Sequence, residues 1–129
     1  MGSWGIQPWD NDHAADWFGD TFDKTKLAKI VEETLRRDLN ESAEKIRAAS
    51  ALLLLLGRVY VWPIQDLDRH LALAADRLEE MLEAELYLDA PEIKACIAEE
   101  IIELRSRIKG APPIPQLPDP QKKWWQFFK

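Results

Sequence analysis

Cysteine is nearly absent from this sequence, and this bounds how the fold can be held together. Cys96 is the only cysteine among 129 residues, so no disulfide can form within the chain. The N-terminus has no basic segment followed by an apolar run and a small-residue cleavage site. We therefore expect a protein of the reducing cytoplasm whose fold depends on an apolar core.

Histidine is almost as scarce, with His13 and His70 alone in the chain. A two-histidine carboxylate site or a di-iron pair of Glu-x-x-His motifs cannot be assembled convincingly from them. The sequence also lacks a Gly-x-Ser-x-Gly elbow, a glycine-rich phosphate loop and a dinucleotide fingerprint. We predict no catalytic residue and no cofactor. His70 is expected at the surface, and Cys96 on the inner face of a helix.

Basic residues are in deficit, with 17 Lys and Arg against 23 Asp and Glu and a net charge of −6. Nucleic acids and anionic membranes are bound by basic surfaces, so we expect neither as a partner of this acidic protein. The charge is uneven along the chain. Residues 1–23 contain five acids and no Lys or Arg, whereas residues 104–129 contain six bases against one acid. The acidic body is therefore expected to attract the basic C-terminal end.

No apolar run is long enough to cross a membrane, which takes roughly 20 residues. The longest uncharged stretch, residues 48–57, includes the five consecutive leucines of Leu52–Leu56. Five leucines in a row point in every direction around a helix, and a helix that is apolar all round is a buried helix. We therefore predict that a helix over Asn40–Leu56 is the innermost element of a bundle.

Apolar residues recur at three- and four-residue steps through most of the remaining chain, which predicts further helices. The predicted fold is an all-α single domain of four main helices plus a short N-terminal helix. Between two of them, Gly57 is expected in a left-handed conformation and Val59–Pro63 as an extended connector. The other expected elements are a short helix capped by Asp10, Asn11 or Asp12, a helix from Asp23 or Thr25 to Leu39, a long helix from Ile64 or Asp66 to Leu88, and a last helix that opens with a capping box of Asp89 and Glu92 and ends before Gly110.

Proline is concentrated near the C-terminus, where five prolines lie between Pro112 and Pro120. Proline at this density favours an extended polyproline-like strand that has no core of its own. Four aromatic residues follow within residues 124–128, and burial of about 150–250 Å² for each ring outweighs the cost of ordering a few residues. We predict a helical bundle domain over residues 1–110 and a tail over residues 111–129 that packs on the bundle or on a second copy.

The N-terminal segment carries a distinctive series of tryptophan, glycine and acidic residues. The series is Gly2-Ser3-Trp4-Gly5, then Pro8-Trp9-Asp10-Asn11-Asp12, then Ala14, Asp16 and Trp17. It resembles the opening signature of a family of small bacterial proteins catalogued as a domain of unknown function, W-G-x-G-P-[F/W]-[D/E]-N-D-x-A-x-D-[F/W]. The chain departs from this signature at Ile6-Gln7. The resemblance implies an all-helical cytoplasmic protein with no assigned activity, some of whose relatives act near toxin–immunity systems.

The hypothesis for function is non-catalytic protein–protein interaction, with a protein partner or with a second copy of the chain. An accessory or immunity-type module is the expected kind of protein. The residues predicted to bind the partner are Trp4, Trp9, Asp10, Asn11, Asp12 and Asp16. The simpler interpretation of the acidic residues among them is helix capping and compensation of the helix dipole.

Glutamates on the last two predicted helices support an alternative function. Glu79-Glu80-x-x-Glu83 and Glu100-x-x-Glu103 are similar to the E-E-x-x-E and E-x-x-D pattern of all-helical nucleotide pyrophosphatases, with Glu in place of the final Asp. Carboxylates three and four residues apart share a helix face, and two such faces can hold Mg²⁺. The alternative is therefore a Mg²⁺-dependent nucleoside triphosphate hydrolase with Glu80, Glu83, Glu100 and Glu103 as metal ligands. A solvated acidic face is the simpler interpretation.

Overall fold

The computed structural model describes residues 5–109, and the regular elements over this range are all α-helices. This confirms the predicted all-α class. The predictions for Trp4 and for the tail over residues 111–129 fall on positions outside the described residues. Within residues 5–109, no helix has the length and apolar character needed to span a bilayer. The helices are α1 (Asp12–Thr25), α2 (Leu27–Leu35), α3 (Leu39–Leu56), α4 (Ile64–Glu83) and α5 (Pro91–Ser106).

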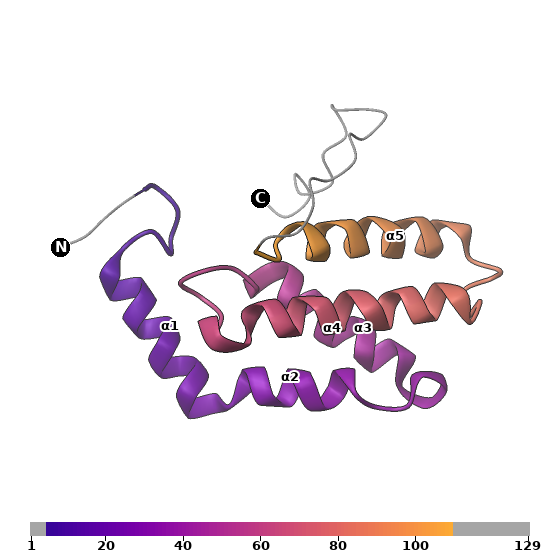
Figure 1. Ribbon diagram of the computed structural model, residues 1–129, viewed down its shortest axis with the longest axis horizontal. Coiled ribbons are helices and arrows are strands. Elements are labelled where there is room, and N and C mark those ends of the chain that lie inside the picture. Colours follow the sequence, from indigo (N-terminus) through magenta and orange to yellow (C-terminus); the bar gives the residue numbers. More distant parts are fainter. Residues whose placement is uncertain (1–4, 110–129) are drawn as a thin grey trace.

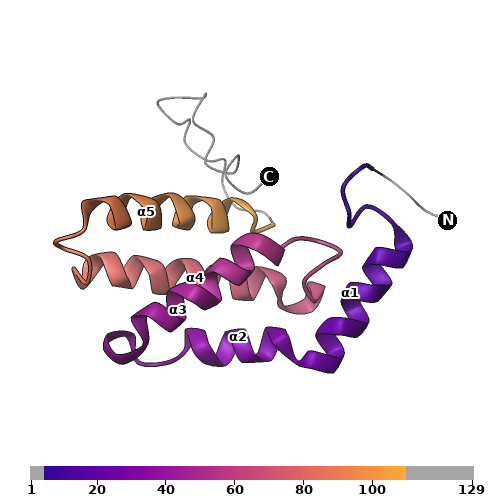
Figure 2. The ribbon, with the colours of Figure 1, turned by 180° about the vertical axis from the view of Figure 1, so that it is seen from behind.

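Helix α4 lies in the middle of the bundle. It packs against α2 on one side and α5 on the other, and α3 crosses its face (Figure 1, Figure 2). Helix α1 is joined to α2 at one end of the bundle and points away from the other helices at an angle. Apolar residues at steps of three and four keep one face of α4 in the core. The buried members of this face are Leu67, Leu71, Ala74, Leu78 and Met81.

The five-leucine run is not buried on all sides, which corrects the prediction that its helix is innermost. Leu53 and Leu54 are buried, whereas Leu55 is 49% exposed. Helix α3 packs on α2, α4 and α5. In Figure 2 it crosses in front of α4, between α2 and α5, and no helix of the described residues covers its front face. Burial of an apolar helix depends on how many neighbours surround it. The central position belongs to α4, which has the more polar sequence.

A single residue separates α1 from α2. Lys26 has φ 56 and ψ 31, the left-handed conformation, and it turns the chain between the two helices. Helix α1 therefore continues through Thr25, past the predicted start of the second helix. Helix α2 ends at Leu35 and does not reach the predicted Leu39.

The helix ends differ from the predictions mainly in their capping residues. Asn11 is one of the three proposed caps of α1, and its Oδ1 accepts a backbone N–H of that helix at 2.8 Å. Helix α3 begins at Leu39, one residue before the predicted Asn40, and it is capped by Asp38, whose carboxylate accepts a first-turn N–H at 3.0 Å. Helix α4 ends at Glu83, earlier than predicted. The capping box predicted for α5 is not formed, because its N-cap is Ala90 without a side-chain hydrogen bond.

The chain turns sharply at Gly57, directly after α3. Gly57 has φ −79, so the predicted left-handed conformation is wrong. Glycine is needed because a Cβ atom would lie 2.4 Å from the Leu53 carbonyl oxygen, which accepts the Gly57 N–H at 2.7 Å. The Arg107 guanidinium donates to the Leu53 and Gly57 carbonyl oxygens at 3.0 and 3.3 Å. A cation just beyond α5 thus satisfies the C-terminus of α3.

Replacing Gly57 by Ala is expected to lower the free energy of unfolding by about 1–3 kcal/mol, the usual cost of forcing extra atoms into a packed site. The new methyl group would push against the Leu53 carbonyl, which is a backbone group that also binds Arg107. Urea denaturation measures the change. Gly19→Ala is the matched control, because a Cβ atom at Gly19 meets nothing within 4 Å and alanine favours a helix. A larger loss in the control than in Gly57→Ala would contradict this account.

Candidate binding groove

The segment between α3 and α4 forms a compact turn, so the predicted extended connector is wrong. The backbone N–H groups of Val61 and Trp62 both donate to the Arg58 carbonyl oxygen at 3.1 Å. Val61 and Trp62 are buried, whereas Val59 and Tyr60 are exposed. The turn therefore places one pair of apolar side chains in the core and leaves the other pair at the surface.

Trp62 is held by two aromatic contacts and one hydrogen bond. Its ring packs edge-on against Phe22 of α1, with the ring centroids 5.1 Å apart, and against His70 of α4 at 6.0 Å. The indole Nε1–H of Trp62 donates to His70 Nδ1 at 3.0 Å. All three side chains are buried. An unpaired polar group at this depth would cost folding free energy, so the hydrogen bond fixes which way both rings face.

His70 lies in the core, where it is 1% exposed, and the prediction of a surface residue is wrong. A tryptophan N–H can only donate, so His70 Nδ1 accepts and the neutral ring carries its proton on Nε2. His70 Nε2–H donates to Glu32 Oε1 of α2 at 2.8 Å. The tautomer is assigned from these two partners. The Trp62–His70–Glu32 hydrogen-bond chain thus joins the turn, α4 and α2.

Glu32 accepts several hydrogen bonds at the α2 end of this hydrogen-bond chain. Besides His70, it accepts hydrogen bonds from Arg69 and from Arg36, the latter at 3.2 Å. The His70 hydrogen bond and then the Arg69 hydrogen bond lower the pKa of Glu32 from its ordinary 4.5 to about 2. Glu32 is therefore a carboxylate at neutral pH, as its role as acceptor for three side chains requires.

A groove of about 550 Å³ runs between α1 and the turn, and we call it the α1 groove. Its volume falls within the range of sites that bind small ligands or side chains of a partner, about 300–1,000 Å³. Its buried lining residues are Phe22, Ala28, Val61 and Trp62. Its other lining residues are Ala15, Gly19, Asp23, Lys26, Lys29, Val59, Tyr60, Pro63, Ile64, Gln65 and Asp66.

Three large apolar side chains along the α1 groove are exposed. Val59, Tyr60 and Ile64 have exposed fractions of 49%, 56% and 65%. Tyr60 also has φ 74, a conformation that costs a residue with a Cβ atom roughly 1–2 kcal/mol. Backbone strain of this kind gathers at binding and catalytic sites, where the surrounding fold maintains it. The exposed apolar side chains and the strained backbone together mark the groove as a candidate binding site.

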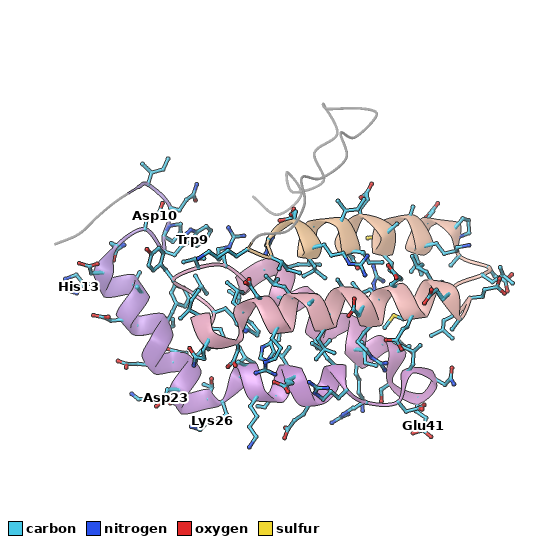
Figure 3. All side chains as sticks on the ribbon, viewed as in Figure 1. Trp9, Asp10, His13, Asp23, Lys26 and Glu41 are labelled. Carbon is cyan, nitrogen blue, oxygen red and sulfur yellow. The ribbon has the colours of Figure 1, made fainter. Side chains whose placement is uncertain are left out.

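Trp9, from the set predicted to bind a partner, contacts the turn. Its ring lies 4.4 Å from the Arg58 guanidinium, a cation–π distance, and the side chain is partly buried. Burial, followed by repulsion from Arg107, lowers the pKa of Arg58. Trp9 and Asp10 lie above α1 at the end nearest the turn, while His13 points away from the bundle (Figure 3). Trp9 is therefore part of the structure that holds the turn.

The polar members of the predicted set lie at the start of α1, and two of them have structural roles. The Asp10 carboxylate accepts a backbone N–H at 3.0 Å and closes the turn before the helix, and Asn11 caps the helix. Asp12 and Asp16 are exposed. Asp16 directly follows Ala15, which lines the α1 groove. Neither Asp12 nor Asp16 lines the α1 groove itself.

The four glutamates of the alternative metal site lie on α4 and α5, and three of them pair with separate arginines. Glu83 is exposed at the end of α4. Over residues 5–109, no three His, Cys, Asp or Glu side chains form a group that could hold a metal ion. The structure therefore does not bring the four glutamates to a common point. The pairs are Glu80 with Arg77 at 2.8 Å, Glu100 with Arg47 at 3.1 Å and Glu103 with Arg107 at 2.6 Å.

Cys96 lies on an exposed face of α5, which corrects the prediction of an inner face. Its Sγ donates to the Glu100 carboxylate at 3.2 Å. Partial desolvation and then this hydrogen bond raise the pKa of the Cys96 thiol. A raised pKa disfavours the thiolate, which is the reactive form of cysteine.

Sequence reasoning missed the α1 groove because it assigned apolar residues to the core. The run Val59–Trp62 has no polar member to show which side chains leave the core when the chain turns. Gly19 was a usable signal. A glycine inside an amphipathic helix costs about 0.5–1 kcal/mol relative to alanine, so its presence in α1 indicates a surface that something approaches closely.

Glu32→Gln is expected to lower the free energy of unfolding by roughly 1–2 kcal/mol at pH 7, because the charge that holds His70 and two arginines is lost. A carboxylate with a lowered folded-state pKa stabilises the fold above its unfolded-state pKa and ceases to do so as the pH falls through its folded-state pKa. The difference between variant and parent should therefore shrink as the pH falls from 4.5 to about 2. Urea denaturation across this pH range measures it.

The matched control is Glu33→Gln, which removes an exposed carboxylate from the neighbouring position of α2. Its effect is expected to stay within about 0.5 kcal/mol, as is usual for surface substitutions. Equal losses in the two variants, or a Glu32→Gln deficit that persists unchanged at pH 2, would contradict the assigned role of Glu32.

Comparison with known proteins bears on the N-terminal part of the chain. No match was found among curated proteins or among solved structures. Residues 2–58 include α1, α2 and α3 and stop just before the exposed Val59 and Tyr60. This segment matches the model of a family described as a domain of unknown function (DUF4259), which confirms the predicted resemblance to a family of that description.

Proposed function

We propose that this protein is a non-catalytic interaction module that binds an apolar segment of a protein partner in the α1 groove. The observation that carries the proposal is the exposure of Val59, Tyr60 and Ile64 along a groove whose floor is Phe22 and Trp62. Apolar side chains gathered at one exposed site, next to buried aromatic rings, are typical of protein-binding surfaces. A partner side chain inserted there would remove the three exposed side chains from water and would pack against the rings of the floor.

The backbone of the turn supports the same proposal. Tyrosine rarely adopts a positive φ, yet it occupies position 60, where Asn or Gly would relieve the strain. The aromatic ring of Tyr60 is thus kept in an exposed position at a cost in stability. Tyrosine is enriched at binding surfaces because it offers a large rigid contact area together with one polar atom. We interpret Tyr60 as a contact residue for the partner.

The charges around the groove indicate the chemistry of the partner. Helix α1 carries four aspartates, at positions 12, 16, 20 and 23, against one lysine, Lys24. At the rim, Asp23 pairs with Lys26 at 3.8 Å, and Asp66 pairs with Arg69 at 2.6 Å. Lys29 adds one positive charge to the lining. The other aspartates of α1, at positions 12, 16 and 20, favour a segment that combines aromatic or aliphatic side chains with flanking lysine or arginine. An accessory or immunity-type role, in which one protein covers a surface of another, needs such a groove and no catalytic group.

Photo-crosslinking from the groove tests the proposal in cells that produce the protein. Ile64 is 65% exposed and lines the groove, so a benzoylphenylalanine at this position should form an adduct with a partner protein. Leu88 is the matched control position, because it is 59% exposed and belongs to the connection between α4 and α5, at the opposite end of the bundle. We expect a partner adduct from position 64 and a much weaker one from position 88.

A second substitution links the adduct to the groove itself. Gly19→Arg adds a long side chain where a Cβ atom meets nothing within 4 Å, and arginine is a good helix former, so the fold should be kept. Loss of the adduct in this variant is the expected result. An adduct that forms equally from positions 64 and 88, or that is unaffected by Gly19→Arg, would refute the proposed binding site.

A further inference from the structure

We infer that, in the protein without a partner, the α1 groove is occupied by the chain's own C-terminal segment, residues 110–129. This inference rests on the proposed function, since it takes the α1 groove as the binding surface. It adds the identity of the first occupant. The consequence is that a partner has to displace a segment of the same chain before it can bind.

The described part of the chain ends at the same end of the bundle as the groove. Helix α5 runs back toward the end of the bundle that carries α1 and the turn (Figure 1, Figure 2). The backbone N–H of Lys109 donates to Asp68 in the first turns of α4 at 3.3 Å. Two residues before Asp68, the groove lining begins with Asp66, Gln65 and Ile64. The C-terminal segment therefore starts at the same end of α4 as the groove wall, on the α5 side of that helix.

The length of the segment is sufficient to reach any part of the groove. Residues 110–123 precede the aromatic residues and include the five clustered prolines. In a polyproline-like conformation of about 3.1 Å per residue, they would extend roughly 40 Å. The longest helix, α4, has 20 residues and is about 30 Å long. Proline-rich spacing also limits the conformational entropy that docking would cost, because the φ angles are already restricted.

The composition of the segment matches the chemistry of the groove. Trp124, Trp125, Phe127 and Phe128 supply four aromatic rings, and the groove offers Val59, Tyr60 and Ile64 over a floor of Phe22 and Trp62. The segment carries three lysines against one aspartate, and α1 carries four aspartates against one lysine. The charged residues that line the groove are balanced, with Asp23 and Asp66 against Lys26 and Lys29. The apolar term therefore favours association directly, and the acidic α1 adds a longer-range attraction.

Gly19 supplies the room that such an occupant needs. It lies within α1, where alanine would be more stable, and a Cβ atom there would contact no described residue. The part of the groove wall formed by Gly19 therefore has no side chain. A planar aromatic ring can lie against this bare backbone.

Paramagnetic broadening in the purified full-length protein tests the inference. A nitroxide is attached at Asp20→Cys, next to the groove on α1, in a Cys96→Ser background. The indole N–H signals of Trp124 and Trp125 are assigned by single Trp→Phe substitutions. We expect both signals to lose intensity relative to the same sample after reduction of the nitroxide. A nitroxide at Glu92→Cys, in the first turn of α5 and far from Lys109, should leave them at full intensity.

Two further samples decide how the segment is held. Gly19→Arg should restore both signals, because the arginine fills the groove and repels the lysines, whereas Ala98→Arg on the exposed face of α5 should not. Mixing nitroxide-labelled protein with a separate isotope-labelled copy should produce no broadening. Full intensity with the Asp20 label, broadening that survives Gly19→Arg, or broadening in the mixed sample would each overturn docking within one chain.

The two tests fail independently. Broadening in the purified protein concerns the chain alone, whereas the adduct from position 64 concerns a partner in cells. A groove-dependent partner adduct without broadening would remove this inference and leave the proposed function in place. Broadening without a partner adduct would mean that the groove binds the C-terminal segment and no partner, which would refute the proposed function.

Discussion

The structure depends on one hydrogen-bond chain, in which buried Trp62 donates to buried His70 and His70 donates to the partly exposed Glu32. The three residues come from the turn, from α4 and from α2, so the chain closes only when all three elements are in place. Each polar group would cost folding free energy if it were buried without its partner. Apolar packing has no preferred direction, whereas a hydrogen bond requires its donor and acceptor to face each other. This chain therefore sets the position of the turn on the bundle.

The same hydrogen bonds shape the α1 groove. His70 and Phe22 hold Trp62 in the core, and in this arrangement of the turn Val59 and Tyr60 are exposed. The strain at Tyr60 is maintained by the anchor two residues later. A rigid floor with exposed apolar walls is suited to binding, since little conformational entropy is lost when a partner arrives. Trp62 thus belongs both to the hydrogen-bond chain in the core and to the lining of the groove.

Much of the helical content could be predicted from the sequence, because regular apolar spacing on α4 and α5 requires a helix with one buried face. The leucine run was misjudged for a physical reason: composition shows that Leu55 can be buried, but its exposure depends on how many helices surround α3. His70 was misplaced because its burial depends on Trp62 and on Glu32, which is 38 residues away in sequence. No local pattern reports such a partner.

The candidate groove was beyond reach for a related reason. The apolar turn and the acidic α1 could both be recognised in the sequence. Their contact depends on the left-handed conformation of Lys26, which the neighbouring charged residues do not indicate. The turn direction at Gly57 likewise follows from a carbonyl contact and not from a glycine-specific φ. Sequence patterns predict elements well where one periodicity governs them. They fail where the conformation of a single residue determines the relative orientation of two elements.

The nitrogen resonances of the His70 ring test the central claim most directly. In a protein labelled with ¹⁵N at histidine, the hydrogen-bond chain predicts at neutral pH an acceptor Nδ1 and a protonated Nε2, together with a Trp62 indole proton that exchanges slowly with water. A proton on Nδ1, or a Trp62 indole proton that exchanges as fast as that of exposed Trp17, would contradict the account.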